Sequence, residues 1–118
     1  MDIWKHGKYV DMWSLVHFLS GFLLVAIFYK LGYQITSALF ISALLLMAWE
    51  AFEWVVKIIE PSVNVIMDII VGLFGFAIGA ILFYFLNQPF EDYFYIIALL
   101  TAALSLWGFL DFKKKGYR

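Results

Sequence analysis

The chain has 118 residues, of which 65% are hydrophobic, and its formal net charge is −1. Soluble domains are usually about 45–50% apolar, so these values exclude a soluble enzyme or a nucleic-acid-binding domain and predict a membrane protein with a single domain over residues 1–118. The absence of cysteine excludes disulfides and thiolate metal ligands.

Four apolar stretches follow one another, over residues 12–29, 35–59, 63–86 and 93–110. Each approaches the roughly 20 residues that a helix needs to cross a hydrocarbon core, and backbone groups in lipid must be satisfied within the helix. Pro61, Pro89 and Gly32 fall in the short joints between the stretches. Short joints make neighbouring helices antiparallel, so the predicted fold is an all-α, up-down bundle of four transmembrane helices.

Basic residues indicate the orientation of the bundle, because Lys and Arg accumulate in cytoplasmic segments. With both termini in the cytoplasm, seven of the eight basic residues lie inside and only Lys30 lies outside. Aromatic residues, which favour the membrane interfaces, then form an inner belt of Trp13, Trp54 and Trp107 and an outer belt of Tyr29, Tyr33, Tyr84 and Tyr93.

Four ionisable side chains lie deep within the predicted spans: His17, Glu50, Glu53 and Asp68. A charged group inside a span is costly, so such residues are rare and by default mark a functional site. His17 and Asp68 lie roughly 8 Å from the cytoplasmic ends of their helices at a rise of 1.5 Å per residue. Glu53 and Glu50 lie about 9 Å and 14 Å from the cytoplasmic end of theirs. The topology therefore predicts that all four meet near the cytoplasmic face.

Helical spacing places these residues on inward faces. Glu50 and Glu53 are three positions apart and share one side of their helix. Asp68 shares a face with Asn64, Gly72, Gly75 and Gly79. Small residues allow a second helix to approach closely, so Asp68 is predicted to point into the bundle, where Thr101 and Ser105 of the fourth span complete the lining.

One imidazole and three carboxylates at the same depth require protons or a cation to offset their charge. Nitrogen and oxygen ligands suit zinc, manganese or iron, so the predicted metal ligands, and candidate catalytic residues, are His17, Glu50, Glu53 and Asp68. The same side chains suit general acid–base catalysis near a headgroup phosphate, or a proton relay. A purely structural role, with protonated carboxyl groups hydrogen-bonded inside the bundle, is the remaining alternative.

Three short motifs occur in order between residues 11 and 82: His17-Phe18-Leu19-Ser20-Gly21, then Trp49-Glu50-Ala51-Phe52-Glu53-Trp54, then Asp68 before Gly72, Gly75 and Gly79. With this pattern the chain resembles the VanZ-like group of small membrane proteins, and especially the YjdF-type (DUF2238) family. The resemblance implies a role in the cell envelope. A fainter similarity, through the same acidic residues, is to the small diacylglycerol and undecaprenol kinases.

These features predict a multi-pass protein of the cell membrane that binds, or binds and modifies, an envelope lipid or its headgroup with the help of a divalent metal. The alternative is a small oligomeric transporter or channel whose carboxylates carry protons or cations. A third possibility is an accessory subunit in which the polar cluster only stabilises the fold. Membrane lipids are the expected partners, and the transporter alternative adds further copies of the chain. The spacing of the four ionisable residues does not decide whether the protein is an enzyme.

Overall fold

The structure is a computed structural model that describes residues 12–55 and 62–115 of the chain. Its elements are α1 (Met12–Lys30), α2 (Ile35–Val55), α3 (Ser62–Ala80), the π-helical turn η1 (Ile81–Phe85) and α4 (Phe90–Lys115). The described residues contain no strand, and four helices among them, counting α3 with η1, are long and apolar enough to cross a membrane. This confirms the predicted all-α chain with four helices of spanning length.

The third and fourth predicted spans differ most from the observed helices. The third span, predicted over 63–86, ends in the π-helical turn, and the fourth, predicted over 93–110, runs from Phe90 to Lys115. The fourth helix is longer because Glu91 and Asp92 in its first turn, and Lys113 near its last, complement the helix dipole. Residues 56–59 of the predicted second span lie outside the described residues.

The joint between α1 and α2 is a tight glycine turn. Gly32 has a φ of 84°, a conformation that glycine adopts without the steric cost of a Cβ. Its backbone N–H donates to the carbonyl of Tyr29 (3.1 Å), and the N–H of Tyr33 donates to the carbonyl of Phe28 (3.0 Å). This pair of bonds is a Schellman motif, which satisfies the last carbonyls of α1 and reverses the chain into α2.

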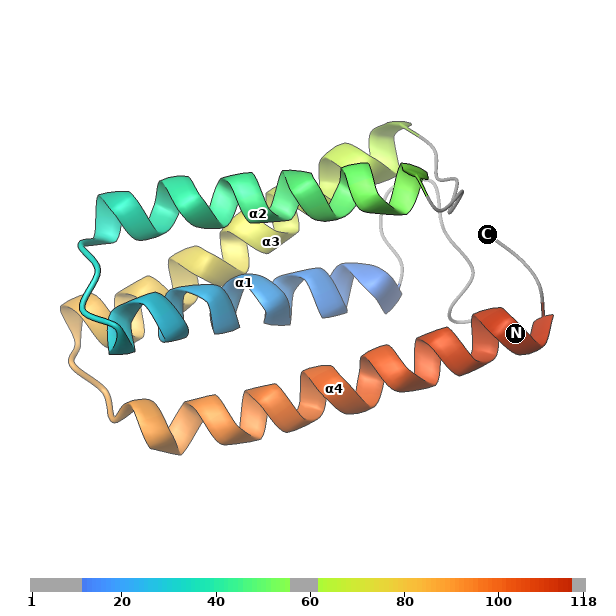
Figure 1. Ribbon diagram of the computed structural model, residues 1–118. Coiled ribbons are helices and arrows are strands. Elements are labelled where there is room, and N and C mark those ends of the chain that lie inside the picture. The colour runs from blue at the N-terminus through green and yellow to red at the C-terminus, as the bar shows by residue number, and fades with distance from the viewer. Residues whose placement is uncertain (1–11, 56–61, 116–118) are drawn as a thin grey trace.

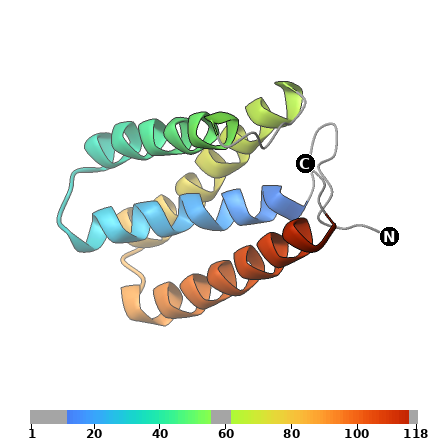
Figure 2. The same ribbon diagram turned by 45° about the vertical axis from the view of Figure 1, so that its right-hand side comes forward.

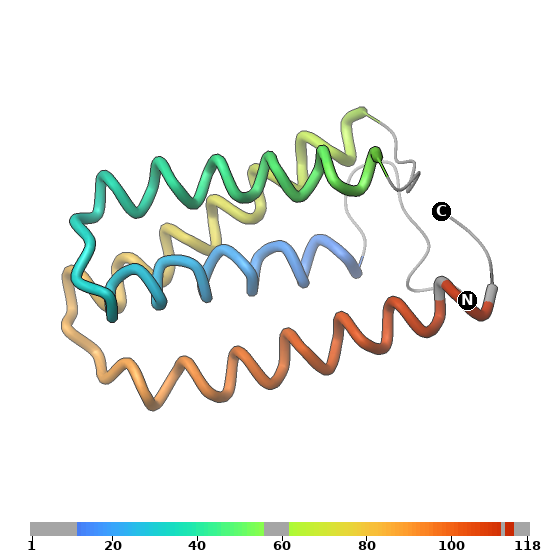
Figure 3. The backbone as a smooth tube through the Cα atoms, viewed as in Figure 1, coloured from blue at the N-terminus to red at the C-terminus, as the bar shows by residue number. Residues whose placement is uncertain are grey.

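The four helices form an up-down bundle in which α1 is central. Consecutive helices run in opposite directions, as the chain path in Figure 3 shows. Helix α1 contacts α2, α3 and α4, and α2 and α4 lie on opposite sides of it (Figure 1 and Figure 2). The first turns of α1 and α3 and the last turns of α2 and α4 therefore share one end of the bundle.

Glycines bring α1 and α3 into backbone contact, as their predicted inward face requires. A methyl group on Gly21 would overlap the backbone carbonyl of Gly72, and a methyl group on Gly75 would overlap the backbone carbonyl of Phe18. Only glycine permits so close an approach of two helices. The small-residue face of α3 thus packs on α1 and directs Asp68, on the same face, into the bundle.

Aromatic side chains fill the opposite end of the bundle, where η1 meets the first turns of α4. The fully buried Phe83 lies among Tyr29, Phe90 and Tyr93, with ring centroids 5.6 to 6.2 Å away. Next to it, the Tyr84 hydroxyl donates to the carbonyl of Tyr33 at 2.8 Å. We call this end the aromatic end; it contains the tyrosines predicted to form the outer belt.

Candidate functional site

The four predicted site residues lie between α1, α2 and α3. His17 is on α1, Glu50 and Glu53 are on the last turns of α2, and Asp68 is near the start of α3. Asp68 is fully buried, and the other three are 6–9% exposed. We call these residues the carboxylate–histidine cluster.

Distances confirm that the cluster is one site. The imidazole Nε2 of His17 lies 3.3 Å from Oδ2 of Asp68 and 4.0 Å from Oε1 of Glu50. One nitrogen or oxygen from each of the four residues can be chosen so that all lie within 4.8 Å of one another. Three helices that run in alternating directions therefore bring their deep ionisable groups to the same point, as the depth calculation predicts.

The carboxylate oxygens of the cluster are short of hydrogen-bond donors. Both oxygens of Glu50 and both of Asp68 are buried, and among the described residues no group donates a hydrogen bond to them in acceptable geometry. Ionised carboxylates only accept hydrogen bonds, so neighbouring carboxylates cannot satisfy one another. Buried polar atoms are nearly always hydrogen-bonded in native proteins, so four buried oxygens that accept no hydrogen bond from the described residues favour added protons or a bound cation.

The charges in the cluster lead to the same requirement. Three carboxylates face one imidazole, so even a protonated His17 leaves an excess of negative charge. Removing unpaired charge from water costs several kcal/mol per ion, even after relaxation. The excess negative charge must therefore be neutralised by added protons or by a bound cation.

The donor set matches a divalent cation that accepts nitrogen and oxygen ligands. Zinc binds His nitrogen and carboxylate oxygen at about 2.0–2.2 Å, and manganese and iron accept the same ligand types. Ligand atoms on one tetrahedral ion lie roughly 3.3–3.6 Å apart. The four donor atoms here lie within 4.8 Å of one another, so the more distant of them would move inward when the ion binds.

Residues that the sequence placed beside the cluster have different outcomes. Ser105 of α4 lies on the wall of a cavity that His17 also lines, whereas the Thr101 hydroxyl donates to the carbonyl of Ile97 within its own helix (2.7 Å) and is not part of the site. Asn64, one turn before Asp68 on α3, is fully buried. It was not among the predicted site residues, although its spacing of four from Asp68 is the signal that identifies it as a neighbour.

Comparison with models of known protein families, with curated proteins and with solved structures found no match. The resemblance to VanZ-like proteins, carried by the motifs around His17, Glu50 and Asp68, therefore stays a prediction.

Proposed function

We propose that this chain is a multi-pass protein of the cell membrane that holds a divalent cation with His17, Glu50, Glu53 and Asp68 and uses it to bind the headgroup of an envelope lipid. The observation that carries the proposal is the convergence of four buried donor atoms within 4.8 Å. The unpaired oxygens of Glu50 and Asp68 give a reason why a cation is needed. The VanZ-like motifs favour a role in the cell envelope.

The position of the cluster supports contact with the cytoplasmic leaflet. It lies at the end of the bundle where α1 and α3 begin and α2 ends, which is also the end where α4 reaches Lys113 and Lys114. Under the positive-inside rule this end faces the cytoplasm. Exposed lysines at the end of α4 attract anionic headgroups, so the headgroup layer would lie at the same end of the bundle as the cluster, roughly 8–14 Å from it along the helices.

A cation in this position would polarise a headgroup oxygen or a bound water, which is the usual contribution of a metal to phosphoryl or acyl chemistry. Residues from three helices would fix its position. The nitrogen of His17 and the carboxylates of Glu50 and Glu53 would be direct ligands and would leave a position open for the headgroup oxygen, while Asp68 would hold the ion through His17 and would accept a proton.

Metal analysis of the purified full-length protein tests the proposal. We expect wild-type protein to contain stoichiometric zinc, manganese or iron, and Glu50→Gln to lose it because an amide is a poorer ligand than a carboxylate. The matched control is Glu91→Gln, since Glu91 is an exposed carboxylate at the opposite end of the bundle; this variant keeps the metal.

Wild-type protein that binds no added zinc, manganese or iron contradicts the proposal. In that case the carboxylates act as proton or cation carriers, as in a small oligomeric transporter or channel, or only stabilise the bundle. Proton or cation flux into liposomes containing the protein separates these two outcomes, because only the transporter produces a flux that Glu50→Gln abolishes.

A further inference from the structure

An apolar cavity of about 490 Å³ lies beside the cluster, between α1, α2 and α4. Its volume falls within the range of roughly 300–1,000 Å³ that small-molecule sites occupy. Most of its wall is hydrocarbon, and His17 is the one cluster residue that lines it. The cavity and the cluster thus share a side chain.

The cavity extends along the helix axes from the end of the bundle toward its middle. At the outer level, Trp13 of α1 packs edge-on against Phe109 of α4, with ring centroids 5.4 Å apart, and Trp49 of α2 lines the same region. At the inner level the wall is formed by Leu24 and Leu45. Trp13 and Leu24 are eleven positions apart on α1, which corresponds to about 16 Å along the helix.

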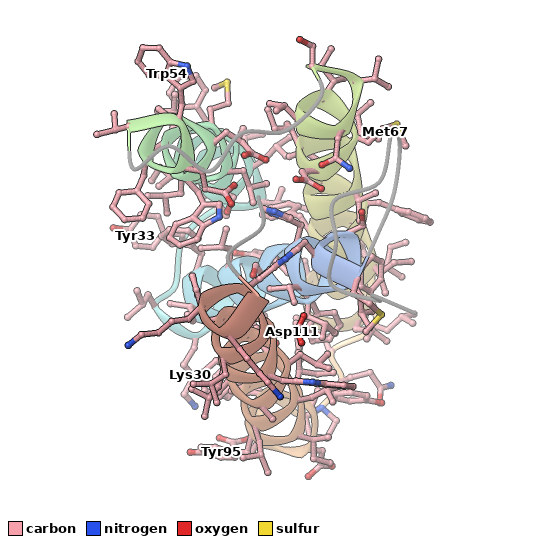
Figure 4. The ribbon with its side chains drawn as sticks, turned by 90° about the vertical axis from the view of Figure 1, so that its right-hand side faces the viewer. Lys30, Tyr33, Trp54, Met67, Tyr95 and Asp111 are labelled. Atoms are coloured by element: carbon pink, nitrogen blue, oxygen red, sulfur yellow. The ribbon has the colours of Figure 1, made fainter. Side chains whose placement is uncertain are left out.

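The open side of the cavity faces away from α3. None of its lining residues comes from α3, and α2 and α4 stand on opposite sides of α1 (Figure 1). Trp49, Leu45 and Phe109 on its walls remain partly exposed. The outer faces of α2 and α4 also carry exposed aromatic residues, such as Trp54 and Tyr95, which point away from the bundle in Figure 4. In a chain that spans a membrane, this side meets lipid.

We propose that the cavity holds one hydrocarbon chain of a membrane phospholipid, with the phosphate of that lipid at the His17 level. This inference rests on the proposed function, because the phosphate is the group that the cation would bind. The cavity has the direction of a lipid chain in a bilayer, begins at interfacial tryptophans and continues among leucines. Of its polar side chains, the Ser20 hydroxyl already donates to the carbonyl of Val16 (2.8 Å), so His17 on α1 and Ser105 on α4 are the polar side chains that would meet the phosphate.

Selectivity must come from the headgroup. A hydrocarbon chain that leaves the bilayer for the cavity exchanges one apolar environment for another, so its transfer contributes little free energy. The hydrocarbon chain of the lipid determines its orientation in the cavity, and the contact between its phosphate and the cation determines which lipids bind. A suitable probe therefore needs both a hydrocarbon chain and a phosphate.

The test uses full-length protein in phosphatidylcholine nanodiscs and dodecyl phosphate that carries a photoreactive diazirine at the end of its chain. We expect saturable labelling of the segments around Leu24 and Leu45, reduced by unlabelled dodecyl phosphate. Dodecanol, which has the hydrocarbon chain but lacks the phosphate, leaves this labelling unchanged. Equal competition by dodecanol, or labelling spread evenly over the exposed face of α4, would overturn the proposal.

Adjacent leucines of α2 provide matched variants. Leu45 lines the cavity and Leu44 does not, yet their exposed fractions are nearly equal, at 46% and 48%. A tryptophan at position 45 would fill the cavity, so Leu45→Trp should lower the labelling about tenfold, which corresponds to ~1.4 kcal/mol, while Leu44→Trp leaves it unchanged. Identical labelling of the two variants would show that the hydrocarbon chain of the probe does not occupy the cavity.

Metal content separates this inference from the proposed function. Leu45→Trp is expected to keep its metal, which shows that the variant is folded and that the cluster is intact. If the protein binds metal but the probe does not label the cavity, the lipid site is refuted while the metal site is supported. Labelling of the cavity in wild-type protein that contains no metal refutes the proposed cation while it supports the chain site.

Discussion

The two ends of the bundle treat their polar groups in opposite ways. At the aromatic end, the Tyr84 hydroxyl has a backbone acceptor, and Lys30 pairs with Glu91 at 3.3 Å. At the other end, the buried oxygens of Glu50 and Asp68 accept no hydrogen bond of acceptable geometry from the described residues, and the His17 imidazole, 3.3 Å from Asp68, faces three carboxylates. The first arrangement is what a folded chain needs for stability, and the second is what a chain needs when a ligand completes it. The difference separates an end whose described polar groups are satisfied within the chain from the end that the proposed function uses.

The largest expected effect is at the aromatic end. Phe83 is fully buried at the centre of the ring cluster, so Phe83→Ala should lower the free energy of unfolding by about 3–5 kcal/mol. The measurement is thermal or denaturant unfolding in detergent. Phe85, which is largely exposed, provides the control, and Phe85→Ala should change stability little. Equal losses in the two variants would mean that the aromatic end is not the stabilising end.

Metal removal is expected to have the next largest effect, and at the opposite end. A bound cation stabilises the folded state by about 2.7 kcal/mol when its concentration is 100 times its dissociation constant. A chelator should therefore lower the unfolding temperature of the wild type and of Glu91→Gln. It should leave Glu50→Gln unchanged, because this variant has no metal to lose. A chelator effect of the same size in Glu50→Gln would exclude the cluster as the metal site.

A smaller effect is expected at Ser42, one of the buried residues of α2. Its hydroxyl is fully buried and has no hydrogen-bond partner within residues 12–55 and 62–115, so Ser42→Ala should raise the unfolding free energy by roughly 1 kcal/mol. Ser20→Ala is the comparison, because the Ser20 hydroxyl is bonded to the Val16 carbonyl and its removal should give no gain. If Ser42→Ala is destabilising, the hydroxyl has a partner such as a bound water. The polar region would then extend from the carboxylate–histidine cluster along α2 as far as Ser42.

The smallest effect is expected for the ion pair at the aromatic end. Lys30 and Glu91 are both more than half exposed, and exposed pairs contribute about 0–1 kcal/mol. Lys30→Gln should therefore shift the unfolding midpoint only slightly, and added salt should remove the difference from the wild type. A large shift that persists in high salt would show that the aromatic end depends on charge as much as on packing.

The sequence was sufficient to predict the cluster because its position depends on only two regular quantities. Helix rise fixes the depth of His17, Glu50 and Asp68, and helix periodicity with the glycine face of α3 fixes their direction. Both quantities follow from spacing along the chain. The convergence of the side chains is therefore confirmed, while their role as metal ligands stays a prediction.

The cavity and the π-helical turn were not predictable in the same way. Helix α4 is apolar on nearly every side, so its composition does not indicate which face meets α1 or how far it stands from α2. The cavity beside His17 depends on that lateral placement. Residues 81–85 are as apolar as the α-helix before them, and no breaker marks the change to a π-helical turn. The sequence placed Trp13 in the inner aromatic belt and Trp49 in a motif around Glu50, and neither assignment indicates that both residues line one cavity.

The glycine contact between α1 and α3 divides the carboxylate–histidine cluster into two mechanical halves. His17 and Asp68 belong to helices whose backbones touch at Gly21 and Gly75, so their separation is set by main-chain atoms and is stiff. Glu50 and Glu53 come from α2, of which only 17% of the span is buried, against 44% for α1. A cation bound by all four residues would therefore tie α2, the less buried helix, to the closely packed pair of α1 and α3.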